Sequence, residues 1–490
     1  MKRPIRLLFR LLLFAGLIFA GILTINTISF SSKQLFIEAV EKIPIDEEVV
    51  ARFAQAIQIP SVSHPSSIDT AAFRKLATFI QTSYPLIDSF LEKEPVSEYS
   101  FVFKWQGKNP KLNPLLLMAH MDVVPVEASS LEKWNEPPFS GNIRDGFIWG
   151  RGTMDDKLSG FGLLEAISLL LEVDYRPQRT VYLAFGQDEE VGGENGAKRI
   201  AANFKKQGIE FEFVLDEGAL VAEDAMPGLD KPLAMIGVAE KGYATLELRA
   251  QLKEGGHSSM PPAETAVGLL SSAILKLQNN PFPAKIDGAV GSMFRYVGPE
   301  MNFPYKVLFA NLWCTKGLIM SQLAKTSSSR AMIRTTAAPT MIRGGFKENV
   351  LPTNATATVN FRILPGETVE SVMDYVRETI DDERVAVSLP EGSFGDNPSE
   401  VSSTESFGFQ VIQTTIKQLF PDAVVAPSLV IAATDSRHFS EVSKHIYRFL
   451  PIQILKKDTK RFHGIDERVS FENYKQAVRF YRQLILNACR

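Results

Sequence analysis

The sequence predicts an α/β fold with a central mixed β-sheet flanked by helices, into which a second α+β domain is inserted. Three observations predict it. Short apolar runs of strand length alternate with segments of helical length from residue 99 to residue 216. Polar and apolar residues then alternate one by one from Tyr243, as in a half-exposed strand. The chain of 490 residues also exceeds what one hydrophobic core usually organises.

The first folding unit is predicted to begin with two helices and to continue with alternating strands and helices. The run from 115 to 119 is apolar at every position, which is typical of a strand in a sheet covered on both faces. The order of the elements indicates a sheet with crossover helices. The expected helices span 45–57, 71–84, 158–171 and 193–203, and the expected strands span 99–105, 115–119, 180–185 and 211–215.

The second folding unit is predicted to start near Tyr243, where the pattern changes, and to hold both helices and strands. The expected helices span 263–278 and 369–380, and strands are expected within 348–364 and at 385–389. From about residue 398 the chain returns to long helices and short strands that should rejoin the first unit. The predicted domains are an N-terminal membrane anchor or signal segment (1–30), a catalytic domain (45–241 and 396–490) and an inserted lid or dimerisation domain (242–395).

The stretch from 280 to 345 has many aromatic residues and little clear periodicity. We expect most of these aromatic side chains to lie in the core. The alternative is that some of them line an apolar substrate pocket. The residues concerned are Phe294, Tyr296, Phe303, Tyr305, Phe309 and Trp313.

Charge and cysteine content exclude two classes of protein. The formal net charge is −3, from 53 basic and 56 acidic residues, and no basic stripe suited to nucleic acid is present. The two cysteines, Cys314 and Cys489, lie far apart and match no metal-ligand spacing. Nucleic acid is therefore not the expected partner, and a disulfide framework is not expected.

The N-terminus carries a membrane-targeting pattern. Four basic residues, Lys2, Arg3, Arg6 and Arg10, precede an uncharged apolar run from 11 to 25. No convincing cleavage site follows, so an uncleaved anchor is favoured over a signal peptide. The basic cluster keeps the N-terminus in the cytoplasm and places the catalytic domain on the extracytoplasmic side. If the segment is cleaved instead, the protein is secreted.

Acidic and imidazole residues gather at the ends of the predicted strands. In an α/β sheet, functional groups collect beyond the carboxyl ends of the strands, so these side chains should meet. Two divalent cations need about three protein ligands each, one of them shared, and a further carboxylate to accept a proton. The group therefore predicts a two-metal hydrolase site, made of His120, Asp122, Asp155, Glu189, Glu190, Asp216 and the distant His463.

Five motifs in order resemble one known family. They are AHMDVVPV at 119–126, GRGTMDDK at 150–157, QDEEVGG at 187–193, LDEG at 215–218 and GGHSSMPP at 255–262. The chain is similar to the di-zinc aminoacylase and carboxypeptidase family over residues 45 to its end, and most to the branch of carboxypeptidase S and N-acyl-amino-acid hydrolases. The resemblance implies a zinc-peptidase-like catalytic domain and two zinc ions per chain.

The resemblance also implies roles for single residues. The implied metal ligands are His120, the bridging Asp155, Glu190, Asp216 and His463. Asp122 lies two residues after His120 on the same side of the strand, so it can orient the imidazole through the second nitrogen. Glu189 is the implied general base, and His257 the implied oxyanion stabiliser, supplied by the partner subunit in dimeric relatives. A homodimer is therefore an open possibility.

The substrate is predicted to carry an amide bond and a free α-carboxylate. Arg437 is the candidate for binding this carboxylate, and Asn349 the candidate for a further hydrogen bond. The expected activity is hydrolysis of N-acyl amino acids, with short peptides as the alternative substrate. A catalytically inactive, membrane-tethered binding protein is the alternative from another class. The chain has no G-x-S-x-G motif, which disfavours a serine hydrolase.

Overall fold

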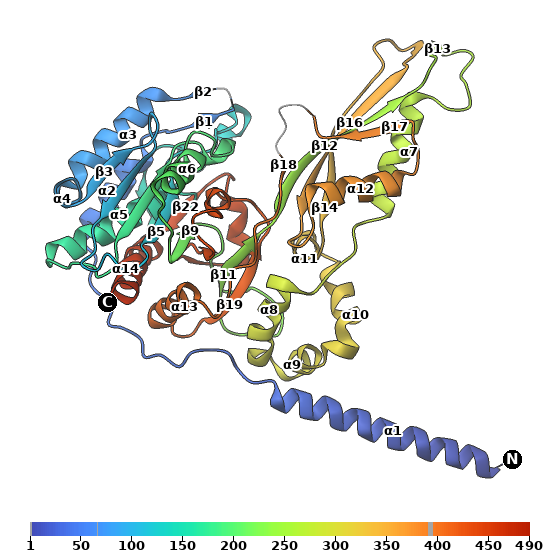
Figure 1. Ribbon diagram of the computed structural model, residues 1–490, viewed down its shortest axis with the longest axis horizontal. Coiled ribbons are helices and arrows are strands. Elements are labelled where there is room, and N and C mark those ends of the chain that lie inside the picture. Colours follow the sequence, from blue (N-terminus) through green and yellow to red (C-terminus); the bar gives the residue numbers. More distant parts are fainter. Residues whose placement is uncertain (1, 66, 391–394) are drawn as a thin grey trace.

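Two β-sheets organise the chain in the computed structural model, which describes residues 2–65, 67–390 and 395–490. The large sheet is mixed and the small sheet is antiparallel, and they lie in separate lobes (Figure 1). Strands β11 (Leu233–Glu240) and β12 (Gly242–Gln251) join the lobes, with Lys241 alone between them. The Lys241 ammonium is buried and donates to the carbonyls of Ala331 and Arg334. This lysine therefore fixes the point where the chain passes from one lobe to the other.

The large sheet confirms the predicted mixed α/β architecture. Its centre is parallel, in the order β20-β9-β5-β8, and antiparallel strands flank it. Every residue of β5 is buried, as expected of a strand covered on both faces. The strands are β3 (Glu92–Pro95), β4 (Phe101–Trp105), β5 (Leu115–His120), β8 (Val181–Gly186), β9 (Phe213–Asp216), β10 (Val221–Ala222), β11, β19 (Val424–Val430), β20 (Ile446–Arg448) and β21 (Gln453–Ile454).

Helices cover both faces of the large sheet. Leu115 and Leu117 face the core under one set of helices, while Leu116 and Met118 pack under α6 on the other face. The first face is covered by α2 (Glu47–Ile57), α5 (Lys157–Glu172) and α14 (Phe471–Ala488), and the second by α6 (Ala197–Gln207). Further elements of this lobe are α3 (Thr70–Ser83), α4 (Pro85–Phe90), α13 (Phe407–Leu419), β1 (Ser63–His64), β2 (Ser67–Ile68), β6 (Ile143–Arg144), β7 (Phe147–Trp149) and β22 (Arg468–Ser470).

The small sheet has its own core. In β12 buried residues alternate with more exposed ones, as the sequence predicts, and the buried side chains pack beneath two helices. These helices are α7 (Ala266–Asn279) and α12 (Val369–Ile380). The strands are β12, β14 (Thr336–Gly344), β16 (Asn354–Ile363), β17 (Val385–Ser388) and β18 (Gly395–Asp396), and a separate pair, β13 (Gly256–His257) and β15 (Val350–Leu351), forms the far tip of the lobe (Figure 1).

The aromatic stretch between the lobes folds into short helices that the sequence pattern did not predict. They are α8 (Gly288–Val297), α9 (Phe303–Ala310), α10 (Leu312–Leu323) and α11 (Ser327–Ile333). Helix α8 packs against β19, and buried residues of this stretch belong to the core of the large sheet. Phe294 and Tyr296 are buried as expected, but Phe303 and Trp313 are largely exposed. The domain bounds remain a prediction, since these helices lie within the predicted insert yet pack with the catalytic lobe.

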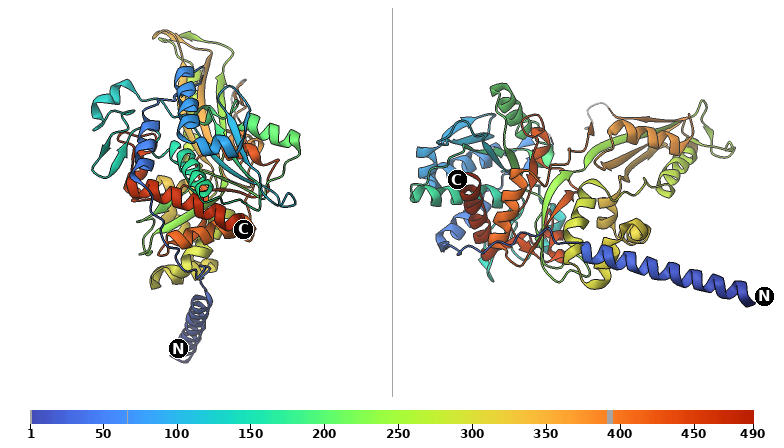
Figure 2. Two further views of the ribbon diagram at one scale, coloured as in Figure 1. Left: turned by 90° about the vertical axis from the view of Figure 1, so that its left-hand side faces the viewer. Right: turned by 60° about the horizontal axis from the view of Figure 1, so that its bottom comes forward.

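The N-terminal helix α1 (Lys2–Ser29) projects from the body of the protein (Figure 2). Its segment Pro4–Ser29 is long and apolar enough to cross a membrane. Most of its apolar side chains are exposed, although α1 also contacts α9. A membrane would cover these side chains, whereas water would not stabilise them.

Candidate metal centre

Three neighbouring parallel strands bring the predicted site residues together. His120 ends β5, Glu189 and Glu190 follow β8 in a single turn of 3₁₀ helix, and Asp216 ends β9. Strand β5 pairs in parallel with both β8 and β9, so the carboxyl ends of all three lie at one edge of the sheet. The site lies at this edge.

Asp155 is the centre of the site because each of its oxygens contacts a different imidazole. The Nε2 atom of His120 lies 2.9 Å from Oδ1, and the Nε2 atom of His463 lies 3.0 Å from Oδ2. The His463 Nε2 atom is also 3.2 Å from Glu190 Oε2. A carboxylate between two imidazoles is the arrangement that a bridging metal ligand requires. Ligand atoms of His120, Asp155 and Glu190 all lie within 4.8 Å of one another, so together they could hold a metal ion.

Asp122 supports this group from behind and is completely buried. Its Oδ1 lies 3.4 Å from His120 Nδ1, on the side of the ring away from Asp155. The same carboxylate accepts hydrogen bonds from the backbone N–H groups of Glu189 and Glu190, at 3.1 and 3.2 Å. The Ser63 hydroxyl donates to it as well, at 2.5 Å. Asp122 therefore orients an imidazole and positions the backbone of both glutamates.

Asp216 joins the acidic cluster through β9, but both of its oxygens accept backbone hydrogen bonds. The donors are the N–H of Ser436, at 2.8 Å, and the N–H of Glu217, at 3.0 Å. Burial raises the pKa of Asp216, and the backbone hydrogen bonds and Arg448 oppose this rise. The neighbouring Glu217 also has a pKa well above its ordinary value, because it is desolvated beside Asp155 and Asp156.

The site concentrates desolvated carboxylates. Burial raises the pKa of Glu189, Asp156 and Asp435 well above the ordinary range. Burial would also raise the pKa of Asp155, but hydrogen bonds to the two histidines bring it below its usual value. The hydrogen bonds of His463 with Asp155 and Glu190 raise the pKa of this imidazole to about 10. So many carboxylates in one desolvated place repel each other unless cations lie among them.

Several buried carboxylate oxygens of the site have no hydrogen-bond partner in the described part of the chain. They are both oxygens of Asp156, Oδ1 of Asp188, Oε1 of Glu190 and Oδ1 of Asp435. Buried polar atoms normally have partners, so such a group indicates a ligand or ion. Oxygen and imidazole donors without thiolates suit divalent cations such as zinc. The side chains present therefore fit a metal centre.

A buried ion pair joins the loops that carry Asp155 and His463. Arg151 donates to Glu467 Oε2 at 2.5 Å and to the His463 carbonyl at 3.1 Å. Glu467 Oε1 accepts from the backbone N–H groups of Gly152 and Met154, each at 2.9 Å. Glu467 thus ties together two ligand loops that are far apart in sequence. The sequence analysis missed this residue, although it lies four positions after His463.

Arg437 lies beside the site, and its guanidinium is largely engaged. It donates to the carbonyls of Thr434 and Gly192, each at 2.8 Å, and its Nε lies 3.5 Å from Asp396 Oδ2. The bond to Gly192 holds the turn directly after Glu190. This turn explains why α6 begins at Ala197 instead of at residue 193: Gly192 and Gly193 both adopt positive φ values.

Arg362 is a second cation near the site, and the sequence analysis missed it. It lies on β16, stacks over the Tyr243 ring with 4.9 Å between guanidinium and centroid, and interacts electrostatically with Glu189. Burial and the charge of Arg437 lower its pKa. Within the described ranges its side chain makes no hydrogen bond or ion pair. Only the tertiary packing of the small lobe against the site could reveal this position.

His257 and Asn349 lie together at the far tip of the small lobe, away from the metal centre of the same chain (Figure 1). His257 pairs with Val350 across β13 and β15, and its Nδ1 lies 2.8 Å from the Ser259 hydroxyl. The Asn349 carbonyl accepts from the N–H of Ser258 at 3.2 Å, while its side-chain Oδ1 is buried without a partner in the described structure. One chain alone does not bring these two predicted residues to its own site.

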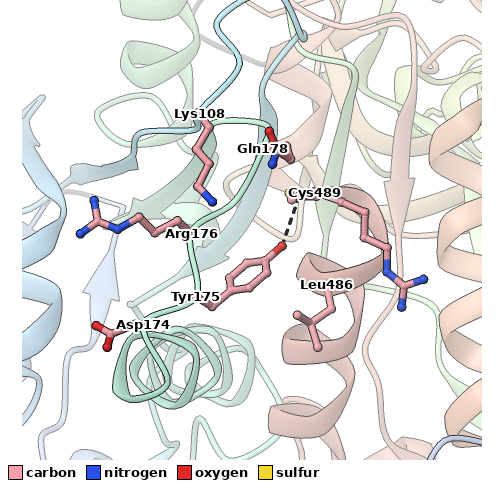
Figure 3. A pocket seen from close by; sticks show the side chains of 8 residues that line it. Lys108, Asp174, Tyr175, Arg176, Gln178, Leu486 and Cys489 are labelled. Atoms are coloured by element: carbon pink, nitrogen blue, oxygen red, sulfur yellow. Dashed lines mark hydrogen bonds between the residues drawn. The ribbon is translucent and has the colours of Figure 1, made fainter.

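A surface hollow of about 420 Å³ lies elsewhere on the large lobe (Figure 3). Its lining includes Asp174, Tyr175 and Arg176, and Tyr175 donates to the carbonyl of Cys489 at 3.2 Å. These residues precede β8, whereas Glu189 and Glu190 follow it. The hollow therefore lies near the amino ends of the strands and is not part of the metal centre.

Comparisons with known proteins agree with this geometry. Residues 116–487 match the family model described as peptidase family M20/M25/M40. A probable carboxypeptidase S-like protein of Dictyostelium discoideum is 42% identical over 478 residues, which cover 95% of this chain and 91% of that protein. The N-fatty-acyl-amino acid synthase/hydrolase of Xenopus tropicalis is 40% identical over 447 residues, covering 90% and 86%. The crystal structure of an M20 family metallo-carboxypeptidase from Sulfolobus solfataricus shares the fold, with a TM-score of 0.67, 18% identity and coverage of 91% and 99%.

Replacement of Asp155 by alanine should lower the amount of divalent metal bound per chain. The substitution removes the one carboxylate that contacts both imidazoles. Elemental analysis of the purified variant measures the loss, with Asp374→Ala, an exposed aspartate of α12, as the control. Full metal content in Asp155→Ala would contradict the central role given to this residue.

Glu467→Gln should weaken metal binding and lower the free energy of unfolding by about 3–5 kcal/mol, because it leaves the Arg151 charge buried without a counter-ion. Glu165→Gln is the control, since Glu165 is also buried and pairs with the partly exposed Arg52 in another part of the lobe. Both variants should lose stability in denaturant titrations. Only Glu467→Gln should lose metal, and equal metal content in the two would show that Glu467 does not position the ligand loops.

Proposed function

The chain belongs to peptidase family M20/M25/M40 and is a metallo-hydrolase, and we propose that its substrates are N-acyl amino acids with a fatty-acyl or other hydrophobic chain. The relative from Xenopus tropicalis is named for N-fatty-acyl amino acids and is 40% identical. The observation that carries the proposal is Glu189, whose backbone Asp122 holds beside the centre formed by Asp155. A protein that only bound its ligand would not need this carboxylate.

Two zinc ions per chain are proposed as the cofactor. The side chains that would hold them are His120, Asp155, Glu190, Asp216 and His463. Support comes from the contact of Asp155 with two imidazoles and from the unpartnered buried oxygens around it. When bound, such ions supply a water of lowered pKa and a Lewis acid for the amide carbonyl.

Glu189 is proposed as the general base. Its side chain makes no hydrogen bond in the described structure, and its carboxylate is desolvated near Asp435 and Glu190, which raises its pKa. A carboxylate with a raised pKa accepts a proton readily at neutral pH. In the proposed reaction Glu189 takes one proton from water as the oxygen adds to the amide carbon. It then gives this proton to the leaving nitrogen as the carbon–nitrogen bond breaks.

Arginine side chains beside Glu189 are proposed to bind the α-carboxylate of the substrate. Arg362 has a guanidinium without a hydrogen-bond partner among the described residues, and such a group forms paired bonds to a carboxylate. Arg437 donates to two carbonyls and shapes the neighbouring turn, and its buried Nε, which lies 3.5 Å from Asp396 Oδ2, makes no hydrogen bond within the described residues. These two residues give the substrate its orientation.

His257 and Asn349 are proposed to act on the site of a second copy in a homodimer. They lie next to each other at the tip of the small lobe, and the buried Oδ1 of Asn349 has no hydrogen-bond partner among the described residues. In this position His257 would stabilise the oxyanion of the tetrahedral intermediate, and Asn349 would add a hydrogen bond.

Short peptides are the alternative substrate, which the carboxypeptidase S-like relative favours. The chemistry at Glu189 would be the same, and only the acyl side would differ.

We further propose that α1 anchors the protein with its catalytic lobe on the extracytoplasmic side. Removal of α1 as a signal peptide would instead release the enzyme.

Glu189→Gln should lower kcat by about 10²–10⁴-fold while metal content stays unchanged, because a proton acceptor is lost and a ligand is not. Steady-state kinetics and elemental analysis on the same sample measure both. Glu194→Gln, an exposed glutamate four residues from Glu190, is the control. Loss of metal with only slightly reduced kcat would mean that Glu189 and Glu190 have exchanged roles.

Longer acyl chains should raise kcat/KM until the acyl pocket is full. Each added methylene group that becomes buried contributes up to about 0.8 kcal/mol, which is roughly fourfold in kcat/KM. The measurement is a series of N-acyl derivatives of one amino acid, from acetyl to long-chain, with a blocked dipeptide beside them. A flat profile, or the highest value for acetyl or peptidyl groups, would favour the carboxypeptidase.

A further inference from the structure

We propose that helices α9 and α10 form a second membrane contact beside α1, so that the body of the enzyme rests on the phospholipid bilayer in one fixed orientation. The two helices together, Phe303–Leu323, are called the platform below. The inference rests on the proposed placement of α1 in a membrane. It goes beyond that placement, since a single anchoring helix with a linker would leave the body free to tumble.

The platform is attached to α1 by a buried polar contact. Asn311, between α9 and α10, is completely buried, and its amide donates to the carbonyl of Leu23 at 3.3 Å and to the Thr27 hydroxyl at 3.4 Å. In return the Asn26 amide donates to Asn311 Oδ1 at 3.0 Å. Buried polar groups of this kind fix one register between two helices, because any other register leaves them unsatisfied.

Apolar contacts extend this attachment along α1. The rings of Phe19 and Trp313 meet edge to face with centroids 5.8 Å apart. Further along, Phe30 packs so closely on Gly298 that a Cβ added there would lie 2.6 Å from its ring. From Phe19 to Phe30 is about 16 Å along a helix. The Phe19 end of this contact lies well inside the possible span Pro4–Ser29, so Trp313 would lie at the depth of the membrane.

The surface of the platform is unusually apolar. Phe303 is 75% exposed, Trp313 59% and Leu318 52%. No residue of α9 is buried. Large apolar side chains that gather on an exposed surface mark a contact with a partner or a lipid. Because the platform adjoins the helix that enters the membrane, a bilayer would cover both at once (Figure 2).

The charge of this region also suits a lipid surface. Residues 302–325, which span the platform, contain three Lys residues and no Arg, Asp or Glu. Lys316 is exposed within α10, between Trp313 and Leu318 in sequence, and Lys325 is exposed just beyond the end of that helix. Apolar side chains beside lysines are typical of segments that lie in the interface of a membrane. A phospholipid bilayer is thus the partner that these side chains fit.

Cys314 offers a natural reporter on the platform. It is exposed, whereas Cys489, the second cysteine of the chain, is buried. A thiol-specific nitroxide therefore labels the full-length chain at Cys314. The protein is reconstituted in vesicles of phosphatidylcholine and phosphatidylglycerol, and the collision rates of the label with oxygen and with a water-soluble nickel chelate are measured. Two further labels on a Cys314→Ser background serve as references, at Leu13→Cys in α1 and at Glu378→Cys in α12.

We expect the labels at 314 and 13 to collide several-fold more often with oxygen than with the chelate, and the label at 378 to show the reverse. Leu318→Asp should move the label at 314 toward water, whereas Leu275→Asp, at an exposed leucine of α7, should not. These measurements do not depend on hydrolysis. If the enzyme does not cleave the proposed substrates, the membrane contact of the platform is still tested.

Three results would overturn the proposal. A label at 314 that is as aqueous as the one at 378, with the label at 13 in lipid, would show that α1 alone enters the bilayer. Aqueous labels at both 13 and 314 would refute the placement of α1 and the platform together. Dipolar broadening at 314 with protection from both collision partners would show that a second copy of the chain covers the platform.

Discussion

The concentration of buried carboxylates at one edge of the large sheet is the constraint on which the site depends. Asp155, Asp156, Glu190 and Asp216 lie together where three parallel strands end, and burial acts to raise the pKa of all four. Only in Asp155 do hydrogen bonds to two histidines outweigh burial and bring the pKa below its usual value. Placing several like charges in a desolvated site costs several kcal/mol per ion unless cations compensate them. A divalent ion neutralises two negative charges while occupying little space. The fold of this edge therefore favours metal binding.

The surrounding side chains hold that cluster in position. Asp122 fixes the His120 ring and the backbone of both glutamates, and Glu467 holds the loops of Asp155 and His463 in place through Arg151. These supporting groups come from distant parts of the sequence. Rigid strands and buried hydrogen bonds keep such ligands at fixed positions before any metal binds, which limits the entropy lost on binding.

The sequence predicts the part of the site that strand ends determine. His120, Glu189 and Asp216 each follow an apolar run, and parallel pairing then requires that they meet. The positions of Arg362 and Glu467 beside the site could not be predicted in this way. They depend on how a lobe or a loop packs, which local periodicity does not encode. The helices of the aromatic stretch could not be predicted from the sequence pattern either. Several of their large side chains are exposed, so the apolar positions show no regular spacing. His257 was found by resemblance alone, and the fold places it far from the site of its own chain.

We infer that the carboxylate edge of the large sheet is a centre for two divalent ions. The most direct test is a calorimetric titration of the full-length wild-type chain, stripped of metal and supplied with Zn²⁺, with elemental analysis of the product after dialysis. We expect two zinc ions to bind to each chain and to remain bound. Binding of one ion or none, by a chain shown to be folded, would contradict it.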